Sequence, residues 1–237
     1  MHISCVSADD FLPACGLALL ACVQATPDAV IGVSGGMTTM RVLAALRERA
    51  LAAGVSLRQV RLVALECGVG IPADSPVSFT TLFRRFFQDG TDVPAQHLLT
   101  FDDAGAEAPV LVGRLAATLQ QLPLTVALIG VGTNAHVAAI EPAGRLPARS
   151  YTSTLTPETV ATLPAEMAGH DQVVTAGMAD LMLAGKILIV ANGARKLASV
   201  AALQGGMIDP QLPVTFFLGH RDVRLITDHA AGRPGGG

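Results

Sequence analysis

The chain has 237 residues, which is long enough to bury most of its apolar surface in a single domain. Apolar residues make up 51% of the chain and charged residues 15%, a composition typical of a filled core and unlike that of a disordered protein. The net charge of −3 comes from interspersed signs with no basic stripe, so we expect no nucleic-acid partner.

The first apolar segment of the chain runs from Phe11 to Val23. It is too short to span a bilayer, and acidic residues stand where a signal peptide carries basic ones, so we expect no membrane partner and a cytoplasmic protein. The four cysteines have spacings that fit neither a zinc site nor a disulfide framework, so we expect reduced thiols.

Short apolar runs then recur along the chain, each followed by a segment with helical periodicity. This alternation predicts βα units, and because most of the runs are solidly apolar we expect a mostly parallel sheet covered by helices on both faces. The expected strands are Ala29 to Val33, Val60 to Leu65, Thr125 to Ile129, Gln172 to Ala176, Ile187 to Ala191, Val214 to Phe217 and Arg224 to Thr227. The expected helices are Ala8 to Gln24, Thr39 to Ala53, Phe79 to Phe87, Ala106 to Gln121 and Ala194 to Gln204.

We expect residues 1–229 to form one α/β domain and the Gly-rich residues 230–237 to form a flexible tail. In open sheets of this kind, ligands bind beyond the carboxyl ends of the strands. Four loops that follow expected strands are therefore candidates for a functional site.

The first candidate loop joins a strand to a helix and contains Gly35, Gly36, Met37 and Thr38. Free backbone amides at the start of a helix favour an anion, so this loop is a candidate phosphate site. Glycines at such a turn can also serve a purely steric purpose.

The second loop places Glu66 and Cys67 at the exit of an expected strand that is apolar from Leu62 to Leu65. A half-desolvated carboxylate at this edge is a candidate general base with a raised pKa, although a helix cap or an ion pair would also explain the residue. For Cys67 both a buried thiol and a pocket residue are open.

The third loop, Gly130 to Pro142, follows an apolar expected strand and carries Asn134, His136 and Glu141. Asn134 and Glu141 flank His136 in the sequence, so a carboxylate can orient the imidazole and tune its pKa. Gly132 allows the backbone to approach a ligand closely, whereas a lone histidine with a structural role is the alternative.

The fourth loop, Asn192 to Lys196, carries Arg195 and Lys196 at the start of an expected helix. Cations are disfavoured there by the helix dipole, so their placement indicates an anion nearby or a solvated face.

With these loops in order, the chain from Val30 to about Asp228 resembles the glucosamine-6-phosphate deaminase and galactosamine-6-phosphate isomerase family. Gly36 and Thr38 stand in the family's phosphate loop, Glu66 and Cys67 replace its Asp-Glu pair, and Lys196 matches its phosphate-contacting lysine. The Pro, Ser and aromatic signature is present in residues 75–79 and ends in Phe86-Phe87. The resemblance implies a Rossmann-like three-layer sandwich of the sugar-phosphate isomerase/deaminase type.

The family's catalytic stretch is similar to Gly130 to Pro142. His136, Glu141 and Pro142 are kept, whereas Thr133, Asn134, Ala135 and Ile140 differ. The retained Glu-Pro pair is more similar to the deaminase branch than to the 6-phosphogluconolactonase branch.

The resemblance implies acid and base chemistry without a metal or an organic cofactor, on a small-molecule sugar phosphate. His136 would open the sugar ring, Glu141 would hold and tune the imidazole, and Glu66 would move a proton between C1 and C2. Asn134 cannot act as a base but can hydrogen-bond a substrate hydroxyl.

Two cationic residues with which the family binds phosphate correspond here to Tyr151 and Ser153, which carry no charge. We expect Arg145 and Arg149 to replace them. Tyr151 then becomes a candidate pocket residue. The resemblance also implies a homo-oligomer.

Two other functions stay open. The changes at Glu66, Cys67, Asn134, Tyr151 and Ser153 would suit a sugar-binding protein that has lost catalysis. They would equally suit a related enzyme acting on a different sugar, lactone hydrolysis included.

Overall fold

The computed structural model describes residues 1–142, 144 and 146–232. At its centre lies a seven-stranded sheet in which neighbouring strands run parallel, in the order β1-β10-β9-β6-β2-β3-β5. These strands are β1 (His2–Val6), β2 (Val30–Val33), β3 (Arg61–Ala64), β5 (Leu98–Leu99), β6 (Val126–Gly130), β9 (Lys186–Ala191) and β10 (Val223–Asp228). The mostly parallel sheet expected from the sequence is confirmed.

The register of the central strands creates the edge at which the candidate loops meet. Gly32 of β2 pairs with Val63 of β3 on one side and with Ala127 of β6 on the other. Ile189 of β9 pairs with Ile129 of β6. The strands therefore end together, and the loops that follow β2, β3, β6 and β9 leave the sheet at one place.

A second sheet of three antiparallel strands, in the order β4-β8-β7, lies beside this edge. Its strands are β4 (Glu66–Gly68), β7 (Tyr151–Thr154) and β8 (Gln172–Thr175). The prediction that the run from Gln172 to Ala176 joins the parallel sheet was wrong. β4 follows β3 almost directly and pairs with β8 outside the main sheet, and Ala176 N donates to Leu65 O at 2.8 Å.

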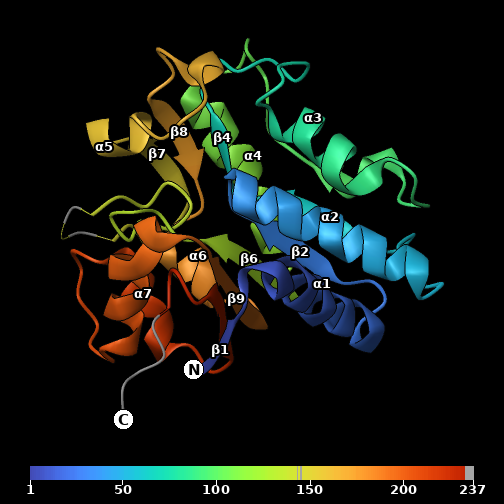
Figure 1. Cartoon of the computed structure of the whole chain (residues 1–237). Coiled ribbons are helices and arrows are strands. Elements are labelled where there is room, and N and C mark those ends of the chain that lie inside the picture. Colours follow the sequence, from blue (N-terminus) through green and yellow to red (C-terminus); the bar gives the residue numbers. More distant parts are fainter. Residues whose placement is uncertain (143, 145, 233–237) are drawn as a thin grey trace.

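Helices flank the central sheet, and α1 and α2 lie side by side (Figure 1). The α-helices are α1 (Ala8–Ala25), α2 (Met37–Ala52), α3 (Phe79–Phe83), α4 (Ala108–Gln121), α5 (Pro157–Val160), α6 (Met178–Met182) and α7 (Leu197–Gln204). A π-helical turn at Arg84–Gln88 continues α3, and 3-10 turns lie at Ala95–His97, Ala165–Met167, Ala194–Lys196 and Pro213–Gly219. Gly16 lets α1 approach α2 closely, because a Cβ there would lie 2.8 Å from the carbonyl of Ala45.

The apolar N-terminal stretch lies in α1. By length and composition alone, this 18-residue helix could cross a membrane. The shortness of the stretch is therefore no argument against a membrane span. One such helix is equally typical of a protein core, and here Phe11, Cys15, Leu19 and Val23 are buried in the main core.

The predicted strand from Val214 to Phe217 is a 3-10 turn instead. Pro213 at its start fixes φ and has no N–H to donate to a sheet. Val214 and Phe217 are both buried and three residues apart, a spacing that a 3-10 turn brings to one face.

Candidate active site

A pocket of about 710 Å³ opens where the carboxyl ends of the central strands meet the second sheet. The loops after β2, β3, β6 and β9 all contribute to its lining, so the four candidate loops come together. Side chains tie these loops to each other. Ser34 Oγ accepts from Gly130 N at 2.9 Å, and Thr38 Oγ1 donates to Asn192 Oδ1 at 2.9 Å.

The loop after β2 supplies backbone amides at the start of α2. Gly35, Gly36, Met37 and Thr38 all line the pocket, and Gly36 forms the N-cap of α2 with a φ of 109°. A Cβ on Gly35 would overlap Glu66 Oε1. Gly35 is therefore required for space and Gly36 is favoured by its positive φ, and the two leave the helix N-terminus open to an anion.

Glu66 is held at the exit of β3, where one carboxylate oxygen is fixed and the other is free. Gly35 N donates to Glu66 Oε1 at 2.7 Å, whereas the buried Oε2 has no hydrogen-bond partner among the described residues. Burial raises the pKa of Glu66 to about 7, the Gly35 amide works against this rise, and the charge of Glu141 adds to it. A carboxyl group with this pKa can both take and return a proton near neutral pH.

His136 is oriented by Asn134. The ring Nδ1 lies 2.7 Å from Asn134 Oδ1, and His136 N donates to the same oxygen at 3.2 Å. Because a backbone N–H can only donate, this side-chain atom must be the amide oxygen, and it accepts the proton on Nδ1 as well. The neutral ring therefore keeps its lone pair on Nε2, the nitrogen available to a ligand in the pocket.

Asn134 also joins the imidazole to a buried carboxylate. Asn134 Nδ2 donates to Glu141 Oε2 at 3.0 Å and to Thr159 Oγ1 at 3.3 Å, while Nδ1 of His136 lies 4.0 Å from the same Glu141 oxygen. Glu141 is 7% exposed. The pKa of His136 is lowered by burial; the charge of Glu141 opposes this shift, and Lys196 contributes to it.

The loop after β6 bends tightly to present this histidine. Gly132 N donates to His136 O at 2.9 Å, and a Cβ on Gly132 would overlap the imidazole ring. Ala135 and Ala138 both adopt positive φ, 68° and 49°, which is unusual for residues with a Cβ. Strained backbone of this kind persists where the surrounding structure enforces it.

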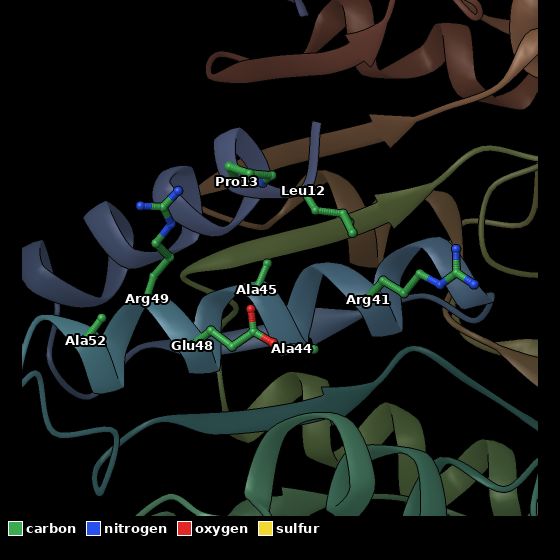
Figure 2. A pocket seen from close by; sticks show the side chains of 8 residues that line it. All are labelled: Leu12, Pro13, Arg41, Ala44, Ala45, Glu48, Arg49 and Ala52. Carbon is green, nitrogen blue, oxygen red and sulfur yellow. The ribbon is translucent and has the colours of Figure 1, made fainter. Parts of the chain in front are cut away.

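Three cations line the pocket on the side of α2 and the loop after β9. Lys196 and Arg195 come from that loop, and burial lowers the pKa of Lys196, with Arg195 adding to the effect. Arg41, one helical turn after Met37, was missed from the sequence. Figure 2 shows it at the end of a groove of about 520 Å³ between α1 and α2, pointing away from Arg49.

Asp228 supports the cationic loop from β10. Both of its carboxylate oxygens accept from Gly193 N, at 3.0 and 3.1 Å, and Oδ1 also accepts from Ala231 N at 2.8 Å. Gly193 has a φ of 84°, a conformation that favours glycine. The carboxylate therefore fixes the turn that carries Arg195 and Lys196.

The chain matches the family model described as glucosamine-6-phosphate isomerases/6-phosphogluconolactonase over residues 8–226. The chain belongs to this family. Among curated relatives, the glucosamine-6-phosphate deaminase of Mycolicibacterium smegmatis is 28% identical over 220 residues, covering 90% of this chain and 84% of the relative. The deaminase of Rhodopirellula baltica is 27% identical over 220 residues, covering 88% and 85%.

Solved structures of the family share the fold. A structure described as a monomeric glucosamine-6-phosphate deaminase has a TM-score of 0.90 at 22% identity and covers 98% of each chain. The 6-phosphogluconolactonase of Trypanosoma brucei has a TM-score of 0.79 at 20% identity and covers 97% of each. The family resemblance and the fold class predicted from the sequence are confirmed.

Three residues expected at the family's site lie elsewhere. In β4, Glu66 and Gly68 face the pocket, and Cys67 between them faces the core, where burial raises its pKa to about 12. Tyr151 lies behind the pocket lining, with its hydroxyl 3.5 Å from Ala139 O. Arg149 has a 72% exposed side chain and pairs with Asp180 at 2.9 Å.

Arg145, the other expected replacement cation, lies outside the described residues, as does most of the expected tail, 233–237. Asn134 contacts His136 and Glu141 through its amide, and its expected hydrogen bond to a substrate hydroxyl stays a prediction.

Within the described ranges, no three or more His, Cys, Asp and Glu side chains gather in a way that could hold a metal ion. The expectation of chemistry without a metal or cofactor stays a prediction. Asp102 is a further acidic residue of the lining that the sequence did not indicate; burial raises its pKa, and it accepts from Thr80 N at 2.8 Å.

Proposed function

We propose that this chain is a cytoplasmic amino-sugar phosphate isomerase or deaminase of the glucosamine-6-phosphate type. Its curated relatives carry that activity in their names. The observation that carries the proposal is one pocket lined by both Glu66, with its unpartnered oxygen, and His136, with its fixed tautomer. In this pair, Glu66 is the base that removes a proton from carbon, and His136 is the base that removes a proton from a hydroxyl group.

The proposed reaction begins at His136. Nε2 takes the proton of the C1 hydroxyl and delivers it to the ring oxygen, which opens the sugar. Asn134 and Glu141 stabilise the imidazolium formed in between, because the amide accepts from Nδ1 and the carboxylate lies 4.0 Å away. These two act as positioning residues.

Glu66 then removes the C2 proton and returns it to C1. When C2 carries an amine, the product of this transfer is a C2 imine, which water converts to the ketose and ammonia. A glutamate reaches one methylene further than the aspartate of the family, a difference that matters because a displacement of about 1 Å can cost on the order of a hundredfold in rate. The bond from Gly35 N fixes the longer side chain and so offsets its added freedom.

The charged group of the substrate is assigned to the cationic side of the pocket. Lys196, Arg195 and Arg41 lie there together with the open amides at the start of α2. A phosphate suits these partners because it accepts hydrogen bonds from both guanidinium groups and backbone amides.

The test is a proton NMR time course with glucosamine 6-phosphate, galactosamine 6-phosphate and their unphosphorylated forms. We expect turnover of a phosphorylated amino sugar and a rate loss of about 10²- to 10⁴-fold in His136→Gln. The exposed His2→Gln serves as the matched control. An unchanged rate in a folded His136→Gln variant would rule out the mechanism.

Hydrolysis of 6-phosphogluconolactone is the second candidate, favoured by the lactonase structures that share the fold. An oriented His136 can activate water without help from Glu66. The two functions separate in Glu66→Gln, which should lose isomerase activity but keep lactonase activity. A sugar-binding protein without catalysis would instead show ligand-induced thermal stabilisation and no product.

The homo-oligomer implied by the family stays a prediction. A neighbour with TM-score 0.90 is described as monomeric, which supports the opposite state. Light scattering distinguishes the 24.3 kDa chain from any multiple of it.

A further inference from the structure

One side of the pocket is apolar, in contrast to the cationic side. Its residues come from the β4–α3 connection, from β8 and from the segment between β7 and β8. We call the following five residues the apolar wall: Ile71, Leu155, Leu163, Met167 and Val173. Ile71, Leu155 and Val173 are buried and the other two are half-buried.

Part of the apolar wall belongs to a small cluster separate from the main core. Buried Ala139, Leu155 and Val173 form this cluster, with Val160 and Leu163 packed against it. Four of its five members also line the pocket, so one side of the cluster faces the ligand space. A sugar hydroxyl placed against it would lose its bonds to water and gain no partner there.

The register of the second sheet places the apolar wall next to Glu66. Gly68 is two residues further along β4, on the same face, and pairs directly with Val173. A Cβ on Gly68 would lie 2.7 Å from Ile71 Cγ1 and 3.3 Å from Met167 Cε. Two residues along a strand correspond to about 7 Å, so the wall begins within the reach of a short substituent from the atoms on which Glu66 acts.

We propose that the apolar wall binds a short acyl chain carried on the C2 nitrogen of the sugar phosphate. This rests on the proposed function, in which Glu66 acts at C1 and C2. With C2 beside Glu66, a substituent on C2 has Gly68 and Val173 within its reach along β4. A free amine there would leave the wall unfilled, whereas an acyl chain of two to four carbons would bury its methylenes against Ile71 and Met167.

The test is titration calorimetry with glucosamine 6-phosphate and its N-acetyl, N-propionyl and N-butyryl derivatives. Each added methylene should tighten binding about fourfold if it is fully buried. In Met167→Gln, which keeps the length of the side chain but makes it polar, the gain per methylene should disappear. Met207→Gln is the matched control, because Met207 is 78% exposed and is not among the residues of the pocket lining described here.

Val173→Thr provides a second variant of nearly the same shape and should also reduce the gain per methylene. Affinity that stays constant or falls along the acyl series, while glucosamine 6-phosphate itself binds, would overturn this inference and leave the proposed function standing. A gain per methylene that survives in both variants would also overturn it. If no member of the series binds, the proposed function fails and the inference fails with it.

Discussion

Replacing Glu66 by glutamine should make the protein more stable and inactive. The pKa of Glu66 is about 7 in the folded chain against an ordinary value of 4.5, mainly because of burial. The folded state therefore binds more protons than the unfolded state between these two values, and the free energy of unfolding falls as the pH rises through this window. Well above pH 7, the free energy of unfolding is lowered by the full cost of burying the Glu66 charge.

The size of this cost follows from the shift. A difference of about 2.5 pKa units corresponds to about 3 kcal/mol, which is an upper limit for a group that borders a pocket. Glutamine keeps an oxygen for the bond from Gly35 N and carries no charge. At pH 8 we expect Glu66→Gln to melt at a temperature up to about 6 to 12 °C higher than the unmodified chain, with little difference at pH 4.5.

Differential scanning calorimetry at pH 4.5, 6 and 8 measures this difference, with the exposed Glu48→Gln as the matched control. The gain should grow with pH in Glu66→Gln and be absent in the control. A variant that is equally stable or less stable at pH 8 would refute the reasoning that a desolvated carboxylate is held in the pocket at the expense of stability.

Three further variants test the remaining parts of the site. Asn134→Asp places a charge beside Nδ1, so it should raise the pKa of His136 by about 1 to 3 units and move the acid limb of the kcat/KM pH profile upward. Lys196→Ala should weaken binding of a sugar phosphate about 10- to 100-fold but affect the unphosphorylated sugar little, as calorimetry would show. Asp228→Asn weakens the support of Gly193, so KM should rise about 3- to 10-fold with kcat nearly unchanged in steady-state assays.

Much of the site could be predicted from the sequence because charged residues directly follow apolar runs. Glu66 stands directly after the apolar run from Leu62 to Leu65, and its placement at the sheet edge follows from the parallel topology. His136 and Glu141 lie in the loop that follows the apolar strand β6. The structure brings all four candidate loops to one pocket.

The features that the sequence did not show depend on which strands pair and on which way side chains point. Alternation along β4 would have turned Cys67 away from the pocket, had the strand been recognised. The apolar run at Gln172 to Ala176 carries no signal for antiparallel pairing outside the main sheet. Arg41 could have been found from its spacing, because it lies one turn after the start of α2 and three residues after Thr38.

The bridge made by Asn134 was also beyond the sequence. An amide in place of a carboxylate indicates a lost base, but not which groups it contacts. Only the folded loop, with Ala135 at positive φ, brings the amide between His136 and Glu141.

The central claim is that Glu66 moves a proton between C1 and C2 of a phosphorylated amino sugar. The most direct measurement is proton NMR in D₂O with glucosamine 6-phosphate, comparing the unmodified chain with Glu66→Gln. We expect the unmodified chain to form a ketose product, with deuterium at C1 only to the extent that the proton held by Glu66 exchanges with solvent before its return, and Glu66→Gln to form none while it still binds the sugar. Product formed at an unchanged rate by Glu66→Gln, or no turnover by the unmodified chain, would contradict the claim.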